Sequence, residues 1–436
     1  MGSETRLISA VKWLRFQKND KFFAHNSFII YYSSIQDVFL GLLLRILMKA
    51  IPTLRTLVIT LLWCLMSRHA TAQTVDTASA ANLAPRAPLV LGIYAQGSII
   101  MAHTYAIRHL VASHPTGFEV NLQRQTTGAA PWHAWYKFPK VGLALTYYDF
   151  HNPVLGYVFA ASPYISKTFS RGPKHDFSFR LGAGLAYLTN PYNQETNHKN
   201  TIASSALNAT LQFRFEYDYA LTPHLGLLVG AGLNHYSNGA TTKPNFGVNL
   251  PSVVLGLNYH ELRPAPTFNA GGPLPAEVGT NFFNVSTSLG FKQRTEGDKQ
   301  KYLVNSLTLA VGRRVNRKSN LLLGVEGFND RSLKATLDDT TRAGGQQPDV
   351  KKVGVFVGHE LLFGRLAFVS HLGFYVYAPY KSSTAYYERL GLKYHFTNVV
   401  FGAVDLKIHR GAADVIEFKV GARLPGHRTE PAVDLR

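Results

Sequence analysis

Short runs of alternating apolar and polar residues recur along the chain from Leu89 onward. A period of two puts successive side chains on opposite faces, which is typical of a β-strand. Clusters of Gly, Pro, Asn and Asp separate the runs and predict turns, and no stretch shows helical periodicity. The pattern predicts strands over Leu89–Ala102, Gly117–Gln125, Val141–Asp149, Leu155–Lys167, Asp176–Leu188, Ala206–Ala220, His224–His235, Ser252–Leu262, Asn281–Gln293, Tyr302–Arg313, Asn320–Phe328, Lys352–Leu362, Leu366–Tyr377, Thr384–Tyr394, Val399–His409 and Val415–Leu424.

Many of these segments are longer than the roughly five or six residues of a strand in a soluble sheet. They match the roughly 9–11 residues of a membrane-spanning strand. The odd positions of 225–233 are apolar, whereas Gly226, Gly230 and Gly232 fall on the other face. The odd positions of 253–259 form a second apolar row that ends in Tyr259. Rows of this kind are typical of strands that face lipid on one side.

We therefore predict an all-β protein, a single transmembrane antiparallel β-barrel of about 12–16 strands over residues 89–425. Residues 426–436 are predicted to be a polar tail. A soluble β-sandwich is the alternative, because its hydrophobic faces carry the same alternation. The longest turn-like stretches are expected on the extracellular side, where barrel loops are longer. They are Asn190–Ala203, Arg263–Gly279 and Asn329–Val350.

Residues 48–72 have the features of a secretory signal peptide. The basic residues Lys49 and Arg55 precede an apolar core at 57–66, and Ala70-Thr71-Ala72 forms a cleavage site. The core is shorter than the about 20 apolar residues of a transmembrane helix. The sequence therefore predicts an exported protein that is cleaved before Gln73.

The signal begins unusually far from residue 1. We interpret Met48 as the true start and residues 1–47 as an upstream extension or a reading artefact. The alternative is that residues 1–47 are translated and that 39–47 form part of a long signal or an anchor. Residues 73–88 are small and polar, with two prolines, and are predicted to be a flexible lead-in to the barrel.

Composition excludes several classes of function. Only 16% of the residues are charged and 12% are aromatic, whereas about 25% charged residues is usual for a soluble protein. The only cysteine, Cys64, lies in the apolar core of the signal, so a cysteine-ligated zinc or iron–sulfur site is excluded. The formal net charge of +19 favours anionic partners such as lipid phosphates. No nucleic-acid-binding motif is present, and no nucleic-acid partner is expected.

The candidate chemistry lies at the end of one predicted strand. His235 and Ser237 are two residues apart, so they share a strand face. An imidazole beside a hydroxyl is the minimum unit of an activated serine nucleophile. Both residues continue the apolar odd-numbered row of 225–233, which places them on the lipid-facing side near the membrane boundary. A polar pair on that face needs a functional or interfacial reason.

The residues around this pair resemble a known family. The segment His235-Tyr-Ser237-Asn238-Gly239 and the following Lys243-Pro244-Asn245-Phe-Gly247 are similar to the active-site region of the lipid A 3-O-deacylase (PagL) family. Larger relatives called acyloxyacyl hydrolases are more similar still. Upstream matches include Ser98-Ile-Ile-Met-Ala-His103 and Asp149-Phe-His-Asn152-Pro153, so the resemblance covers roughly residues 89–260.

The resemblance implies an outer-membrane serine esterase that removes an acyl chain from lipid A of lipopolysaccharide, with membrane lipids as its surroundings. It assigns Ser237 as the nucleophile, His235 as the general base and Asn238 as a residue that helps to hold the oxyanion. The N–H groups of Gly239 and Ala240 are expected to add donors in a tight turn. Neither a metal nor an organic cofactor is implied.

One position departs from the family pattern. The acidic third member of the site is expected on the next strand, where this chain has Asn249. An asparagine can orient a histidine, but it brings no negative charge. Three alternatives remain open: a working Ser–His–Asn site, a substitute carboxylate from Glu261 or Asp218, or a non-catalytic barrel, either a channel or a structural protein, with a decayed site.

Other polar residues carry weaker signals. Lys243 and Arg263 are candidates for pairing with the phosphates of lipid A. His103, Trp132, Trp135 and His151 are interpreted as packing residues of the barrel or its interfacial girdle.

Overall fold

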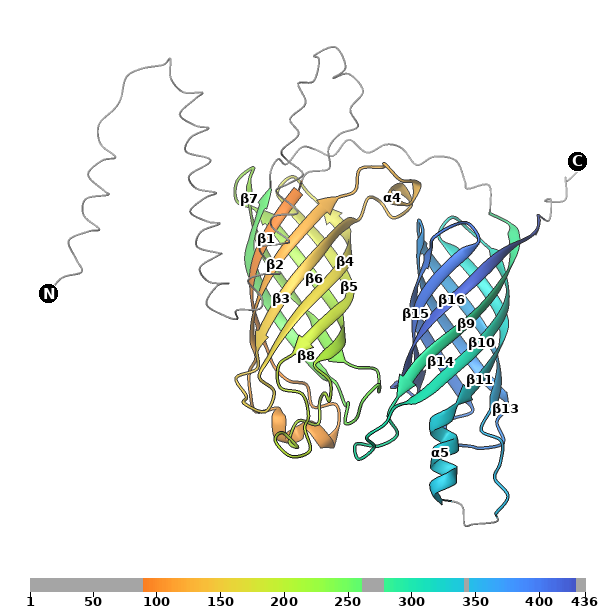
Figure 1. The fold of residues 1–436 in the computed structure, drawn as a ribbon. Helices are drawn as coiled ribbons and strands as arrows, with labels where there is room; N and C mark the ends of the chain where they lie inside the picture. The colour runs from red at the N-terminus through yellow and green to blue at the C-terminus, as the bar shows by residue number, and fades with distance from the viewer. Residues whose placement is uncertain (1–88, 261–277, 341–344, 429–436) are drawn as a thin grey trace, which may run out of the picture. The chain divides into compact units, whose positions relative to one another are not determined.

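The computed structural model describes residues 89–260, 278–340 and 345–428, and these residues form two closed barrels (Figure 1). The expected signal peptide and lead-in lie outside the described residues and stay predictions. The first barrel consists of β1 (Leu89–Ser98), β2 (Thr116–Gln125), β3 (Lys140–Asp149), β4 (Tyr157–Arg171), β5 (His175–Leu188), β6 (Leu207–Ala220), β7 (Leu225–Ser237) and β8 (Val248–His260). Its loops contain the 3-10 helix η4 (Tyr105–Leu110) and the short helix α4 (Pro131–Trp135).

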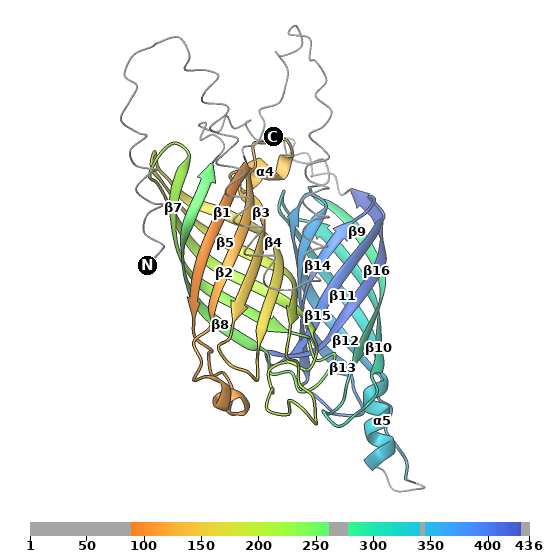
Figure 2. The same ribbon diagram turned by 60° about the vertical axis from the view of Figure 1, so that its left-hand side comes forward.

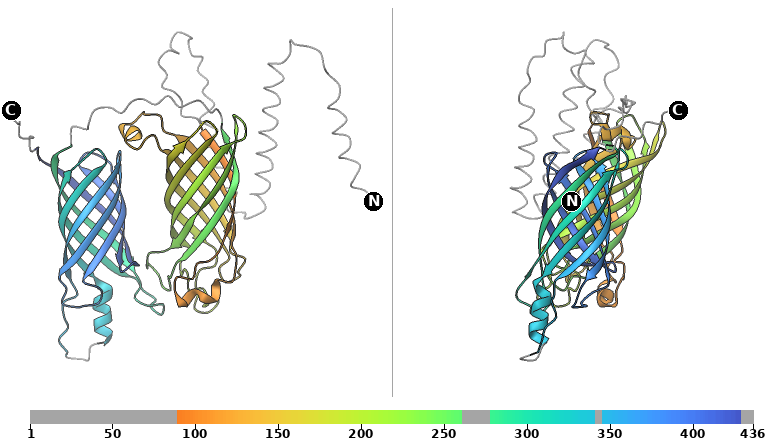
Figure 3. Two further views of the ribbon diagram at one scale, coloured as in Figure 1. Left: turned by 180° about the vertical axis from the view of Figure 1, so that it is seen from behind. Right: turned by 90° about the vertical axis from the view of Figure 1, so that its right-hand side faces the viewer.

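The second barrel has the same number of strands and one longer helix. Its elements are β9 (Thr280–Lys292), β10 (Tyr302–Arg314), β11 (Ser319–Asp330), α5 (Arg331–Thr340), β12 (Lys352–Phe363), β13 (Leu366–Tyr377), β14 (Tyr386–His395), β15 (Val400–His409) and β16 (Ala412–Arg428). Figure 2 and Figure 3 show that strands form the wall of each barrel on every side.

The predicted fold class is confirmed, but the prediction of a single ring is wrong. All sixteen predicted strands form, and within each barrel neighbours in sequence pair antiparallel. β1 pairs with β8, and β9 pairs with β16, so the chain closes twice. Strand length and alternation are the same in one ring of sixteen strands as in two rings of eight. Only the pairing of non-adjacent strands distinguishes them.

The side-chain alternation rules out the soluble sandwich. Outward positions are apolar and exposed, for example Val253 at 67% and Phe418 at 66% of their full surface. Inward positions are polar and buried, which is the reverse of a soluble core. Burying the apolar outer rows therefore requires lipid.

Charged side chains fill the interior of each barrel. In the first barrel, Glu119 accepts hydrogen bonds from Arg180 and Arg214, and all three are buried. In the second, Arg389 is buried and pairs with Glu417. An eight-stranded barrel is just wide enough for side chains to fill it. Each of these charges has a partner of opposite sign inside its barrel, as a low-dielectric interior requires.

The loops differ between the two ends of each barrel. An even number of strands brings both ends of a barrel's chain to one rim, so the odd-to-even connections share the opposite rim. We call this second rim the loop end. In the first barrel it carries the connections 99–115, 150–156, 189–206 and 238–247. The predicted loop Asn190–Ala203 lies there, whereas 263–279 links β8 to β9 and is not a loop within one barrel.

The sequence pattern missed helix α5, which lies in the predicted loop Asn329–Val350 and extends from the loop end of the second barrel (Figure 1). Asp330 accepts a hydrogen bond from the N–H of Ser332 and so caps the first turn. Lys334 and Asp338 pair one turn apart. With ten residues the helix is too short for a clear periodic signal. Among the described residues, no helix is long and apolar enough to cross a membrane.

Candidate functional site

His235, Ser237 and Asn249 come together on the outer wall of the first barrel. His235 and Ser237 end β7, and Asn249 is directly opposite His235 in the ladder with β8. The even-numbered neighbours Asn234 and Tyr236 are buried in the barrel, so the odd-numbered residues point outward. The parity predicted from sequence is thus observed, and the register brings the third residue beside the first.

The three side chains form a continuous line of hydrogen bonds. The Ser237 hydroxyl is 2.9 Å from Nε2 of His235, and Nδ1 of His235 is 2.7 Å from Oδ1 of Asn249. An amide oxygen only accepts hydrogen bonds, so Nδ1 of His235 carries the proton. Nε2 is then unprotonated and accepts from the Ser237 hydroxyl. This is the tautomer that a general base requires.

His103 extends this line beyond Asn249. Nδ2 of Asn249 lies 3.3 Å from Nδ1 of His103, and Nε2 of His103 is 2.9 Å from the carbonyl oxygen of Phe246. The carbonyl requires a proton on Nε2, so Nδ1 accepts from the Asn249 amide. Nδ1 then carries no proton to donate to the Met101 carbonyl oxygen, which is 3.3 Å away. We therefore assign the hydrogen bond of Nδ1 to the Asn249 amide.

This position of His103 follows from backbone pairing that continues past β1. The N–H of Met101 donates to the carbonyl of Asn249, so the chain after β1 stays beside β8. His103 follows two residues later. The sequence interpretation of His103 as a packing residue was therefore incomplete, because only the β1–β8 closure brings it to Asn249. Its place in a segment that resembles the family was the available signal.

The loop between β7 and β8 lies next to the site, at the loop end of the first barrel. Its last residues are tethered to the β5–β6 loop, since the N–H groups of Phe246 and Gly247 donate to the carbonyls of Thr201 and Ile202. Gly239 and Ala240 both have a positive φ, 60° and 64°. No hydrogen-bond acceptor for their two N–H groups is found in the described part of the chain. Two adjacent free donors of this kind can bind an anionic oxygen.

Asn238 is oriented differently from the sequence expectation. It is 4% exposed, and its amide nitrogen donates to Thr242 Oγ1 at 2.8 Å and contacts Ser204 Oγ at 3.4 Å. Its backbone N–H donates to the side chain of Asn245. In this arrangement Asn238 holds the loop together, and its amide does not face the Ser237 hydroxyl as an open donor.

Gly247 lies directly against the catalytic candidates. Its φ is +69°, and a Cβ at this position would lie 3.0 Å from Cε1 of His235 and 3.3 Å from Cβ of Ser237. An L-residue in the left-handed region costs about 1–2 kcal/mol. The added methyl group would also press on the imidazole ring, and small misplacements of catalytic groups are costly.

We therefore expect Gly247→Ala to lower kcat for ester hydrolysis about tenfold. The matched control is Gly279→Ala, which has a similar φ of +86° but nothing within 4 Å of the added Cβ. Steady-state kinetics and thermal melts of both variants measure the two effects. An equal loss of activity in both variants would show that backbone strain, not contact with His235, is responsible.

Apolar residues surround the site on the outer wall. Leu207, Leu211, Met101 and Phe246 are all exposed large hydrophobic side chains. Leu211 pairs with His235 across the β6–β7 ladder. Beneath the wall, Tyr236, Val248 and Leu250 belong to a buried apolar cluster at the loop end. The site thus combines a rigid support with an outer surface suited to acyl chains.

The remaining predicted residues do not join the site. Asp218 pairs with Leu228 in the ladder that pairs His235 with Leu211, so it lies about seven residues, or about 24 Å, along the strand. Asp218 is also buried on the inner face, which excludes it as the substitute carboxylate. Glu261 and Arg263 fall outside the described residues.

Lys243 lies in the β7–β8 loop and is partly buried. Burial lowers the pKa of its amine below the ordinary value. A role for this amine in phosphate binding stays a prediction.

Comparison with known families gives two matches along the chain. The family described as lipid A 3-O-deacylase (PagL) matches residues 116–258. The family described as acyloxyacyl hydrolase, C-terminal domain, matches residues 281–426. The first match includes His235, Ser237 and Asn249, and each match falls within one barrel. No curated protein matches the chain significantly.

Solved structures of barrels are distantly similar. Neisserial surface protein A is 12% identical, with a TM-score of 0.28, over 39% of this chain and 95% of that one. The toluene transporter TodX of Pseudomonas putida is 7% identical, with a TM-score of 0.16, over 80% of this chain and 90% of that one. The assignment therefore depends on the two family matches, which together span most of the chain. The chain belongs to the lipid A 3-O-deacylase (PagL)-like, or acyloxyacyl hydrolase, family of outer-membrane β-barrels, and this membership implies a hydrolase that acts on lipid A.

Proposed function

We propose that the protein is a serine esterase that hydrolyses one ester-linked acyl chain of lipid A with Ser237 as its nucleophile. The observation that carries this proposal is the unbroken hydrogen-bond line from Ser237 through His235 to Asn249 on the outer wall. Nucleophile and base are within hydrogen-bond reach, and a third group orients the base, as nucleophilic catalysis requires.

The reaction divides into two acyl transfers. The Ser237 oxygen attacks the ester carbonyl carbon while its proton passes to Nε2 of His235. The tetrahedral intermediate collapses, and His235 returns the proton to the departing sugar oxygen. Water then attacks the acyl-enzyme, giving up a proton to His235, and the fatty acid is released as Ser237 regains its proton. The N–H groups of Gly239 and Ala240 are proposed as donors to the oxyanion.

Asn249 replaces the usual carboxylate in this scheme. Its amide oxygen holds the proton on Nδ1 of His235 and so leaves Nε2 basic. A neutral amide stabilises the imidazolium less than a carboxylate does. We therefore propose a working but slower Ser–His–Asn site.

Access from the bilayer supports lipid A as the substrate. The site lies on the wall that faces lipid, beside the exposed side chains of Leu207, Leu211 and Phe246. An acyl chain can lie along this surface while its ester reaches Ser237. The site needs no passage through the barrel.

The alternative of a channel lacks an open interior. Arg180, Arg214 and Glu119 are buried across the first barrel, and Arg389 and Glu326 across the second. A water path would have to displace these paired charges, which is costly. A structural barrel with a decayed site is the remaining alternative.

Mass spectrometry distinguishes the esterase from a structural barrel. The full chain, purified in detergent, is incubated with lipid A. We expect a product lighter by one hydroxyacyl or acyl chain, together with the matching free fatty acid. Unchanged lipid A after prolonged incubation with folded protein would exclude the esterase.

His103 is proposed as a positioning residue for this site. Its Nδ1 accepts from the Asn249 amide and so turns the amide oxygen toward His235. His103→Leu removes the acceptor and allows the amide to flip. We expect kcat to fall about tenfold, the range of one lost hydrogen bond, with little change in KM.

A conservative replacement tests that role. His103→Gln can accept from Asn249 and donate to the Phe246 carbonyl, so it should restore most of kcat. His103 is exposed, so both variants should melt at the wild-type temperature. Equal kcat in wild type and His103→Leu would contradict the role, as would equal losses in the Leu and Gln variants.

A further inference from the structure

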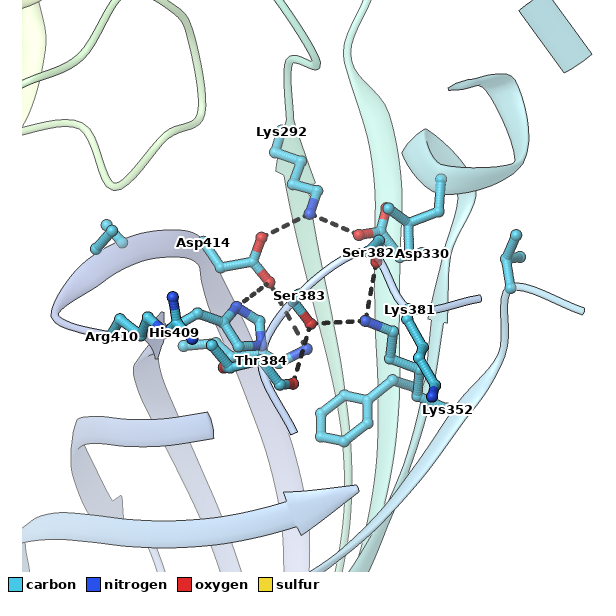
Figure 4. A pocket seen from close by; sticks show the side chains of 16 residues that line it. Lys292, Asp330, Lys352, Lys381, Ser382, Ser383, Thr384, His409, Arg410 and Asp414 are labelled. Atoms are coloured by element: carbon cyan, nitrogen blue, oxygen red, sulfur yellow. Dashed lines mark hydrogen bonds and ion pairs between the residues drawn. The ribbon is translucent and has the colours of Figure 1, made fainter. Parts of the chain in front are cut away.

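A second polar site lies at the loop end of the second barrel, in a cavity of about 520 Å³ (Figure 4). Its wall comes from the ends of β9, β11 and β15, the starts of β12 and β16, and the β13–β14 loop. It opens at the rim of the barrel, on the inner side of the strands. A ligand would therefore enter from water and not from the bilayer.

Two carboxylates in this cavity are shared among several cations. Nζ of Lys292 lies 2.6 Å from Oδ1 of Asp414 and 2.5 Å from Oδ2 of Asp330. Figure 4 shows Lys292 between the two. Asp414 also faces Lys407 at 3.7 Å and His409 at 3.6 Å. Both carboxylates are thus already occupied by Lys292.

Lys352 is buried without a carboxylate partner. It is 6% exposed, and its amine donates to Ser382 Oγ at 3.0 Å and Ser383 Oγ at 2.8 Å. Within the described ranges, no carboxylate lies within 4 Å of this amine. A buried ammonium is costly unless an anion compensates it. Neutral hydroxyl groups compensate it only in part.

Further cations at the rim increase the imbalance. Lys381 and Arg410 line the cavity, are exposed, and form no ion pair with any described residue. The lining therefore holds four lysines and one arginine against two carboxylates, an excess of three positive charges with His409 neutral. Hydroxyl groups of Ser382, Ser383 and Thr384 lie among them.

We propose that this cavity binds a phosphate-bearing anion of about the size of a phosphorylated sugar. Lysine amines act as point charges toward phosphate, and a phosphate offers enough acceptor oxygens for several amines and hydroxyls at once. The volume exceeds that of phosphate alone, which leaves room for a polar group attached to it. The site is independent of Ser237 and of the proposed esterase activity.

The phosphate group can come from two sources. One is a soluble sugar phosphate, and the other is the phosphorylated sugar region of lipopolysaccharide, which extends from the bilayer into water. Both present the same chemistry to the cavity. The experiment below separates them.

Isothermal titration calorimetry of the full chain in an uncharged detergent measures the binding. Glucose 6-phosphate is titrated against glucose, with inorganic phosphate as the minimal probe. Intact lipopolysaccharide is compared with lipopolysaccharide from which the phosphates have been removed. We expect the phosphorylated member of at least one pair to bind at least tenfold more tightly, and less tightly as salt is raised. The pair that responds identifies the source, and equal binding within both pairs would overturn the proposal.

Two variants assign the binding to this cavity. Lys352→Gln removes the buried amine, and Lys381→Gln removes an exposed rim amine in the β13–β14 loop, outside the strand ladder. Each should weaken binding about tenfold. The matched control is Lys351→Gln, which removes a neighbouring exposed lysine outside the lining. Wild-type affinity in both Lys352→Gln and Lys381→Gln would place the binding elsewhere and refute the site.

Discussion

Ser237→Ala should abolish release of fatty acid from lipid A, with kcat reduced about 10⁴-fold or more. Removing the nucleophile of a Ser–His site leaves only binding and oxyanion stabilisation, and losses of that size or larger are known for such sites. The hydroxyl makes a single hydrogen bond to His235 and lies on the outer wall. The substitution should therefore leave the barrel folded and its melting temperature unchanged.

The measurement compares lipid A from cells expressing wild type or Ser237→Ala by mass spectrometry. Purified proteins provide kcat. Ser205→Ala is the matched control, because Ser205 lies in the β5–β6 loop and bonds only locally, to the Leu207 carbonyl and the Asn208 side chain. It should retain wild-type kcat. Identical acylation in wild type and Ser237→Ala, with both proteins folded, would mean that Ser237 is not the nucleophile.

Substitutions at Asn249 should have the second-largest effect. Asn249→Leu removes the acceptor for Nδ1 of His235, so the ring can place its proton on Nε2 and cease to act as a base. We expect kcat to fall about 10³-fold, somewhat less than the about 10⁴-fold loss when a triad loses its carboxylate. Because Asn249 lies between His235 and His103, KM should change little.

Asn249→Asp tests the electrostatic part of the argument. The carboxylate accepts the same bond from Nδ1 and adds a negative charge beside the imidazolium. We expect kcat to equal or exceed that of wild type by up to about tenfold. Steady-state kinetics of the Leu and Asp variants side by side measure both effects. Wild-type kcat in Asn249→Leu would rule out Asn249 as the group that orients His235.

A double-mutant cycle connects this result to His103. If His103 acts only by orienting the Asn249 amide, His103→Leu should cost nothing further once Asn249 is leucine. Additive losses would mean that the two residues act separately.

The two barrels differ in the polar groups that they present, and the family matches divide at the same point. The match to the lipid A 3-O-deacylase family ends at residue 258, and that to the C-terminal domain begins at 281. The hydrogen-bonded Ser–His–Asn line is on the outer wall of the first barrel. The cationic cavity lies inside the rim of the second. The first is suited to a substrate in lipid and the second to an anion in water.

Much of the fold could be predicted from local pattern. Alternation with a period of two predicted all sixteen strands and the outward face of His235 and Ser237, because side-chain direction along a strand depends only on position. Asn249 shares odd parity with the apolar row of 253–259, which is consistent with its outward position in the structure. The length and the apolar row of each strand predicted a membrane environment for the same local reason.

The remaining features depended on which distant strands pair. Closure of β1 on β8 made two barrels from one expected ring and brought His103 to Asn249. The register of β6 with β7 placed Asp218 about 24 Å from His235. The cationic cavity likewise gathers residues from 292 to 414 that no spacing rule connects. Alternation is determined within each strand, whereas ring closure depends on the summed pairing of many strands, so only the tertiary structure decided it.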